Sequence, residues 1–196
     1  KLAELAMGAM LHDVGKTKTP ESILLKSTRL NALEWDEMKR HTRHGFDLLR
    51  LRPELPIRVA HVAYQHHERV NGSGYPRGLR GENIHEFARI VAIADTYDAM
   101  TSDRVYRSGV SPYAALRTID GLRSRQFDSE VVDVFLASVV PYPPGCRVEL
   151  ENGEVGVVVG NPKPGRLRTD ANDSSSEAER EIEVVLHPDG VAPRMI

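Results

Sequence analysis

The proline-rich run at residues 141–145 constrains the fold of this chain more than any other feature. Proline lacks a backbone N–H and fixes φ, so such a run interrupts helices and central strands alike. Before it, apolar residues recur at the spacing of amphipathic helices; after it, short valine-rich stretches resemble strands. The sequence therefore predicts a mainly α-helical domain at residues 1–140 and a small β extension at residues 141–196.

Helical spacing and capping residues set the predicted helices. Asn31 followed by Glu34 predicts a capping box. Ser111 followed by Pro112 predicts a second helix start, and Asp128 predicts the cap of the last helix. The predicted helices span residues 1–12, 20–26, 31–49, 53–68, 83–100, 111–124 and 128–140, and the core-facing residues of the fifth are Phe87, Ile90, Val91 and Ala94.

The extension beyond the proline-rich run carries strand signals. Residues 146–159 predict two short strands around a turn at Asn152-Gly153. A polar segment at about residues 161–181 predicts a flexible linker, and residues 182–186 predict a third strand.

Length and composition fit a globular domain with a small appendage. The chain has 196 residues, of which 40% are hydrophobic and 28% charged. Its longest apolar run, near residues 134–140, is far shorter than the roughly 20 residues of a membrane span. The net charge of -2 gives no general attraction to nucleic acid or anionic membranes. A small anionic substrate would therefore need a local group of basic residues.

The single cysteine, Cys146, excludes an internal disulfide and fits a reducing, cytoplasmic compartment. No signal-peptide pattern is visible. Because the sequence begins at Lys1 without methionine and reads as helix from the start, we expect a fragment of a longer protein. An upstream sensor or receiver domain is expected, and a membrane anchor in the full-length protein stays open.

The first candidate site lies where the first predicted helix ends. His12 and Asp13 are adjacent, so an imidazole and a carboxylate can be offered to one cation. Gly15 allows a tight turn after them, and Lys16 adds a positive charge. The alternative is a pair that only caps the helix.

Two further groups of histidines follow. His41 and His44 share a helix face at i and i+3, although a solvated face is the alternative interpretation. His66 and His67 precede a glycine-rich loop and can line one pocket. Glu68 is placed to accept a hydrogen bond that fixes a ring tautomer.

Acidic and basic residues downstream complete the candidate set. Asp95 follows an apolar stretch, with Asp98 one turn later, and a buried carboxylate there needs a partner. A metal ion is one such partner; a hydrogen-bonded structural aspartate is the other option. Arg104 and Arg107 can form the local positive group that an anionic substrate needs, or a plain surface pair.

Four histidines and two aspartates from separate helices suit a site for two transition metals. This mixture favours iron, manganese or zinc over calcium or magnesium. The sequence lacks the cysteine pattern of a closed structural zinc site.

These motifs, in this order, resemble the HD-GYP family of metal-dependent phosphohydrolases over about residues 1–140. Asn71 stands where the family has aspartate before its Gly-x-Gly-Tyr-Pro loop. The matching segments are His12-Asp13-Val14-Gly15-Lys16, Glu34-Trp35 to His41, His66-His67-Glu68-Arg69, Gly72-Ser73-Gly74-Tyr75-Pro76, Ala94-Asp95, Tyr97-Asp98-Ala99-Met100, Asp103-Arg104 and Tyr106-Arg107.

The resemblance implies an HD-domain helical bundle that holds two or three divalent ions, iron or manganese first and zinc as a further option. Asp13 and Lys16 would take part in catalysis, and Asp13 would bridge two ions. The implied metal ligands are His12, Asp13 and Asp95 for one ion, Asp13, His41, His66 and His67 for a second, and Asp98 for a third. The implied substrate contacts are Lys16, Tyr75, Arg104 and Arg107, next to a loop that contains Gly72, Gly74, Tyr75 and Pro76.

By the same resemblance, we expect a phosphodiesterase that hydrolyses cyclic di-GMP to pGpG or GMP through in-line attack by a hydroxide between the ions. One alternative is a slow or inactive cyclic dinucleotide receptor that docks partners through the loop. Another is an HD-type phosphohydrolase that acts on a different nucleotide. GGDEF-type signalling proteins and a second copy of the chain are the expected partner classes, with no nucleic acid polymer and no membrane.

Overall fold

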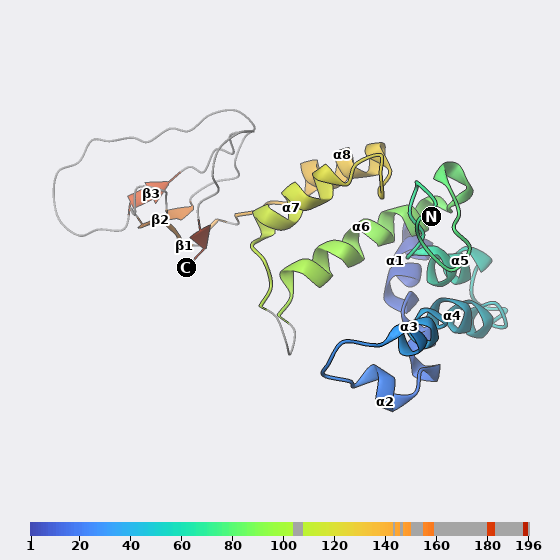
Figure 1. Cartoon of the computed structure of the whole chain (residues 1–196). Helices are drawn as coiled ribbons and strands as arrows, with labels where there is room; N and C mark the ends of the chain where they lie inside the picture. Colours follow the sequence, from blue (N-terminus) through green and yellow to red (C-terminus); the bar gives the residue numbers. More distant parts are fainter. Residues whose placement is uncertain are drawn as a thin grey trace.

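The computed structural model describes residues 1–103, 108–142, 144–145, 147–149, 155–158, 180–182 and 194–195. Figure 1 shows helices through the first two thirds of the chain and a small sheet beyond them. The predicted fold class, mainly α with a small β extension, is therefore confirmed. Within the described segments, no helix has both the length and the apolar character that crossing a bilayer requires.

The helices start where the sequence provides caps. Asn31 forms the predicted capping box with Glu34. Ser111 accepts a hydrogen bond from the Ala114 amide, and Asp128 caps the last helix. The bounds are α1 (Leu2–Leu11), η1 (Val14–Lys18), α2 (Glu21–Leu24), α3 (Ala32–Lys39), α4 (His41–Leu49), α5 (Ile57–Gln65), η2 (Gly81–Asn83), α6 (Glu86–Thr101), α7 (Pro112–Gly121) and α8 (Ser129–Ser138).

The single helix predicted for residues 31–49 is wrong, because the chain forms α3 and α4 with a break at Arg40. The His41 ring donates to the Met38 carbonyl, and the Thr42 hydroxyl donates to the Lys39 carbonyl. These side chains bond carbonyls that a continuous helix would offer to its own amides. The break brings His41 to the start of a new helix.

The helix predicted for residues 53–68 is shorter than expected. It begins at Ile57, because Pro56 has an extended ψ of 137° and occupies the cap position. It ends at Gln65, and His66 and His67 lie in the turn that follows. Both histidines therefore follow the last residue of the helix instead of belonging to it.

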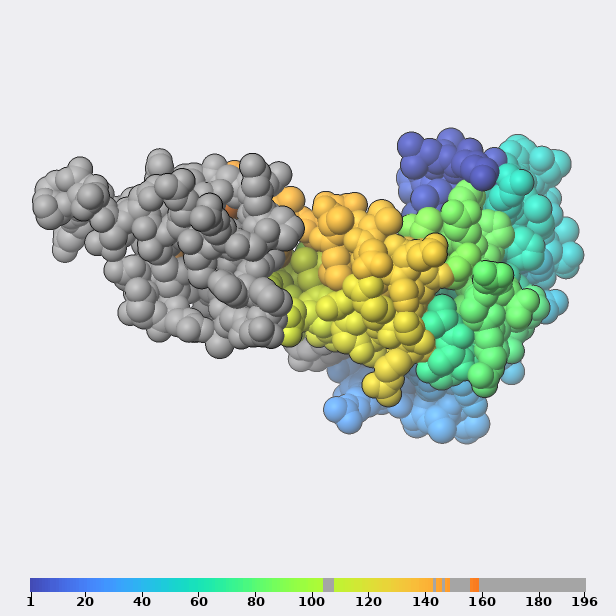
Figure 2. All heavy atoms as spheres, turned by 90° about the horizontal axis from the view of Figure 1, so that it is seen from above, coloured from blue at the N-terminus to red at the C-terminus, as the bar shows by residue number. Residues whose placement is uncertain are grey.

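Helix α6 is the longest of the described helices and joins two groups of helices. Figure 1 shows it between α1 and α5 on one side and α7 and α8 on the other. In Figure 2 the helices form one continuous body. One core cluster, shared by α6, α7 and α8, contains Ala92, Ile93, Ile119, Phe127 and Val132, and a second, shared by α4 and α5, contains Leu49, Val59, Ala60 and Ala63.

The predicted core face of α6 is partly wrong. Phe87 and Val91 are buried as expected, but Ile90 is half-buried and Ala94 is exposed. Ile93 is fully buried instead, because it packs into the cluster with α7 and α8. A helix with neighbours on two sides has two buried faces, whereas one periodic pattern of apolar residues predicts only one.

The described strands form one sheet in the order β3-β2-β1-β4. The bounds are β1 (Arg147–Glu149), β2 (Val155–Val158), β3 (Arg180–Ile182) and β4 (Arg194–Met195). The antiparallel pairing of β1 with β2 agrees with the predicted hairpin, although its Asn152-Gly153 turn lies outside the described residues. β3 begins two positions before the predicted third strand and runs parallel to β2.

Candidate metal centre

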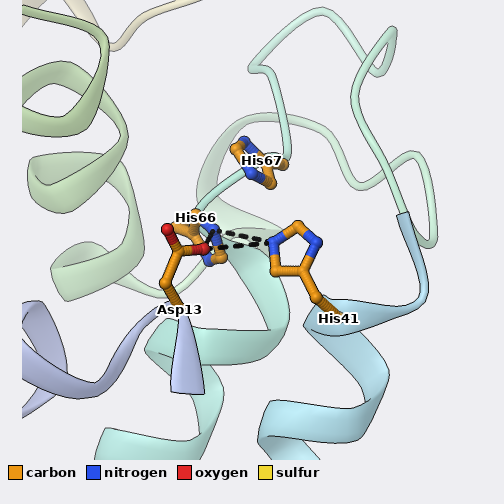
Figure 3. Close-up of side chains that lie close together, drawn as sticks. All are labelled: Asp13, His41, His66 and His67. Carbon is orange, nitrogen blue, oxygen red and sulfur yellow. Dashed lines mark hydrogen bonds and ion pairs between the residues drawn. The ribbon is translucent and has the colours of Figure 1, made fainter. Parts of the chain in front are cut away.

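Asp13, His41, His66 and His67 bring their ligating atoms within 4.8 Å of one another. Figure 3 shows the four side chains converging from three stretches of chain: the turn after α1, the start of α4 and the end of α5. His41 and His66 have relative exposures of 1% and 0%. We call these four residues the Asp13 cluster.

Helix ends orient three of the histidines around this cluster. Carbonyl groups in the last turn of a helix have no amide partner within the helix, so a nearby side chain can bond them. Because a carbonyl only accepts, each ring must carry its hydrogen on Nδ1, which leaves Nε2 with a free lone pair. The Nδ1–carbonyl distances are 2.6 Å for His12 to Ala9, 2.7 Å for His41 to Met38 and 3.0 Å for His66 to Ala63.

The two oxygens of Asp13 face different imidazoles. Its Oδ1 lies 3.4 Å from His41 Nε2 and 3.7 Å from His66 Nε2. Its Oδ2 lies 3.4 Å from His12 Nε2 and contacts the Lys16 ammonium. The buried Oδ1 has no hydrogen-bond partner among the described residues. Lone pairs of oxygen and nitrogen thus point at one another, an arrangement that a divalent cation satisfies.

A further carboxylate stands on the His12 side of Asp13. Asp95 Oδ1, from α6, lies 3.8 Å from His12 Nε2. The Asp95 side chain is partly exposed at 26% rather than buried in the apolar stretch that precedes it. His12, Asp95 and Asp13 Oδ2 thus form a second group of donors next to the first.

The electrostatics of the cluster favour the protonation states that bind metals. Burial raises the pKa of Asp13, but the neighbouring His12, His66 and Lys16 side chains outweigh it and hold that pKa well below its usual range. Burial lowers the pKa of His41 to about 4, and burial with the nearby His66 also lowers the pKa of His67. At neutral pH, Asp13 is therefore ionised while His41 and His67 are neutral.

The family model described as "HD domain" matches residues 1–131, about two thirds of the chain. The chain belongs to the HD domain family. The family that its motifs predicted is therefore confirmed, and the mainly helical fold agrees with it.

Two curated relatives and one solved structure resemble this HD domain. The "Cyclic di-GMP phosphodiesterase PA4108" of Pseudomonas aeruginosa is 38% identical over 80% of this chain and 37% of that protein. The "Cyclic di-GMP phosphodiesterase response regulator RpfG" of Xanthomonas campestris pv. campestris is 47% identical over 67% of this chain and 35% of that protein. The chain therefore spans little more than a third of either relative.

The solved structure of Bd1817, an HDG"Y"P protein from Bdellovibrio bacteriovorus, superposes with a TM-score of 0.53 and 22% identity. The superposition covers 67% of this chain and 43% of the Bd1817 chain. At this level of identity the likeness shows a shared fold.

Two candidate residues of the HD domain, His44 and Asp98, are not part of the Asp13 cluster. His44 lies one turn after His41 on α4 and contributes no atom to the cluster. Asp98 is exposed, and its Oδ1 accepts a hydrogen bond from Ser102. Arg104 and Arg107 lie outside the described residues.

Gly15 is required for a different reason from the turn that the sequence suggested. A Cβ at Gly15 would lie 1.9 Å from the His41 carbonyl oxygen and 2.4 Å from the Gly45 amide nitrogen. The glycine therefore allows η1 to pack directly against α4. This close approach brings Asp13, two residues earlier, next to His41.

Glu68 supports the loop and not a ring tautomer, so its predicted role is wrong. The buried carboxylate accepts hydrogen bonds from the Arg77 amide at 2.8 Å and the Leu79 amide at 2.9 Å. The Nδ1 atom of the His66 ring bonds backbone carbonyls of α5 instead. A carboxylate that follows two histidines is equally suited to either role, so sequence alone does not separate them.

The glycine-rich loop folds back over the turn after α5. The Asn71 side chain accepts hydrogen bonds from the Ser73 amide and hydroxyl, as an aspartate could. A Cβ at Gly74 would lie 2.4 Å from the His67 carbonyl oxygen, so only glycine fits there. The Tyr75 ring consequently lies 4.7 Å from the His67 ring.

Proposed function

We propose that this HD domain is the hydrolytic part of a metal-dependent phosphodiesterase that cleaves cyclic di-GMP to pGpG and then GMP. The observation that carries the proposal is the position of Asp13, whose two oxygens face separate groups of imidazole nitrogens. We assign His12, Asp13 and Asp95 to one divalent ion, and Asp13, His41, His66 and His67 to a second. The names of the two relatives support the choice of substrate.

Iron or manganese suits this mixture of imidazole and carboxylate donors, and zinc is the next choice. Two such ions, when bound, supply an activated water and stabilise negative charge on a phosphoryl group. Asp13 holds both groups of donors together, and the helix-end carbonyls keep each Nε2 aimed inward. Lys16, beside Asp13 Oδ2, adds a positive charge for a phosphoryl oxygen.

Tyr75 is the described residue best placed to hold the nucleotide. Its ring lies 4.7 Å from His67 and 6.5 Å from His41. Burial raises the pKa of its hydroxyl, so the phenol stays protonated and can donate to a phosphate or a base. We propose Arg104 and Arg107 as further contacts to the phosphates.

The test is hydrolysis by purified protein, stripped with a chelator and reloaded with manganese or iron. We expect cleavage of cyclic di-GMP by the reloaded protein, none by the stripped protein, and no release of phosphate from GMP. Binding of cyclic di-GMP without any cleavage would favour a receptor. Cleavage of a nucleoside monophosphate in its place would favour another HD-type phosphohydrolase. The Asp47→Asn variant, changed on the exposed ion pair with Arg43, serves as a control that keeps activity.

A further inference from the structure

Trp35 is the only tryptophan of the chain, and its side chain remains 48% exposed. It lies on the first turns of α3, close to the loop that carries Tyr75. The centroids of the Trp35 and Tyr75 rings are 6.3 Å apart. Large aromatic side chains are usually more buried than this, so a half-exposed indole beside a candidate site needs an explanation.

Tyr75 connects this indole to the Asp13 cluster. The Tyr75 ring lies 4.7 Å from His67 at an interplanar angle of 32°. It also lies 6.5 Å from His41. One aromatic ring therefore separates Trp35 from the candidate metal ligands, so a ligand bound at the cluster can reach the indole.

The two rings form a corner and not a closed stack. Their interplanar angle is 76°, so neither ring covers the face of the other in parallel. A planar base can lie parallel to one ring of such a corner while its edge meets the other ring. Stacking of this kind tolerates any base, because every base has a π face.

The backbone beside the indole is held firmly. Glu34, the preceding residue, completes the capping box with Asn31. Its carboxylate also accepts two hydrogen bonds from the Lys26 ammonium, at 2.7 and 2.6 Å. A fixed aromatic platform loses little conformational entropy when a ligand stacks on it.

We propose that Trp35, together with Tyr75, forms a stacking subsite for one purine base of the cyclic dinucleotide. This inference rests on the proposed function and adds a positioning residue to it. With the base on Trp35, the phosphodiester lies on the side of Tyr75 that faces the Asp13 cluster. Trp35 acts in binding the substrate and takes no part in the bond-breaking step.

An apolar docking surface is the competing explanation, because other large apolar side chains on α2 and α3 are also exposed. Leu33, two residues before Trp35, is 82% exposed. Leu24, the last residue of α2, is 42% exposed, and Leu25, which follows it, is 69% exposed. Leucine preserves the apolar character of such a surface but cannot stack on a base, so Trp35→Leu separates the two explanations.

The first test is steady-state hydrolysis of cyclic di-GMP by metal-loaded protein. Loss of one base-stacking contact predicts that Trp35→Leu raises KM by about 5- to 100-fold and leaves kcat within about threefold. Trp35→Phe, which retains a ring, should recover most of the loss. Leu33→Ala is the control on the same helix and should leave KM unchanged.

The second test uses the fluorescence of the single tryptophan. Titration with cyclic di-GMP should quench Trp35 emission saturably, because a stacked purine contacts the indole directly. Turnover with an unchanged KM in Trp35→Leu and no quenching in the wild type overturns the subsite and leaves the proposed function standing. Saturable quenching without turnover overturns the proposed hydrolysis and leaves the subsite standing.

Discussion

Two groups of histidines lie on the same helical body but differ in what surrounds them. The Asp13 cluster gathers at helix ends, where His66 follows α5 and donates through Nδ1 to backbone carbonyls. The second group, the His61–His85 pair, has parallel rings 6.2 Å apart on α5 and at the start of α6. Both of its side chains are only half-buried.

The polar atoms of the His61–His85 pair serve the fold. The Gln65 side-chain amide donates a hydrogen bond to His61 Nδ1 at 3.4 Å. The side-chain oxygen of Gln65 accepts a hydrogen bond from the His85 backbone amide at 2.7 Å. The His85 Nδ1 atom accepts the Phe87 amide and so caps α6. The comparison teaches that histidines in proximity do not make a metal site. A free Nε2 beside a buried carboxylate oxygen, Oδ1 of Asp13, distinguishes the Asp13 cluster.

The largest expected effect comes from removing the carboxylate that this comparison singles out. Asp13→Asn keeps the shape of the side chain but replaces one oxygen with an NH2 group, so one of the two groups of donors is lost. We expect kcat/KM for cyclic di-GMP to fall on the order of 10³-fold, which corresponds to an activation barrier higher by about 4 kcal/mol. Elemental analysis should show fewer bound ions per chain. Unchanged metal content and rate would remove Asp13 from its bridging role.

The next effect contrasts two histidines only five positions apart. His66→Ala should weaken metal binding by roughly 100-fold or more. Even the loss of a residue that only hydrogen-bonds to a metal ligand lowers metal affinity by about 10- to 100-fold. His61→Ala should leave affinity within about twofold, as expected for a change outside the site. Metal titration followed by calorimetry measures both, with circular dichroism to verify folding. If both variants lost metal affinity equally, the Asp13 cluster could not be distinguished from the His61–His85 pair as the metal site.

A third difference should appear in the pH dependence of stability of the stripped protein. Burial lowers the folded-state pKa of His41 to about 4, below the ordinary value near 6.5. The unfolded chain therefore binds more protons between these values, and stability decreases as pH falls through this window. Because of His41, we expect the free energy of unfolding to decrease by about 1 to 3 kcal/mol between pH 7 and pH 4.5.

Urea unfolding at several pH values in the presence of a chelator measures this dependence. His41→Gln should flatten the curve between pH 6.5 and pH 4.5. His61→Gln should flatten it less, although burial also lowers the pKa of His61, because that side chain is half-exposed. If His61→Gln flattened the pH dependence more than His41→Gln, the proposal that burial perturbs His41 more strongly than His61 would be wrong.

The smallest effect tests the structural role of the second group. His85→Ala removes the acceptor of the Phe87 amide and should reduce the free energy of unfolding by about 1 kcal/mol, as for other N-caps. His85→Asn, which keeps a capping oxygen, should recover most of that stability. Activity per folded molecule should not change in either variant. A specific loss of turnover in His85→Ala would give this pair a functional role.

Local patterns in the sequence predicted many of the helix starts. Asn31 with Glu34, Ser111 and Asp128 cap the helices that they were expected to cap. Capping depends on residues within one turn of each other, so the sequence contains all the information it needs. The same holds for the pairing of two short strands beyond the prolines.

Contacts between helices decided what local patterns left open. Spacing grouped His44 with His41, but the structure places only His41 in the Asp13 cluster. The break at Arg40 is a local effect, because His41 and Thr42 bond carbonyls three residues earlier, but the apolar spacing used for the prediction does not reveal it. Glu68 was assigned to a ring because its loop partners lie nine and eleven residues away.

The sequence by itself determined the helical class, the family and the types of donor that the site contains. Only the tertiary structure decided which imidazoles share Asp13, which oxygen each one faces, and that Trp35 meets Tyr75. The physical reason is the range of the interactions. Helix formation and capping are set within a few residues, whereas the site depends on how closely η1, α4 and α5 pack, and Gly15 permits that approach without revealing its partner.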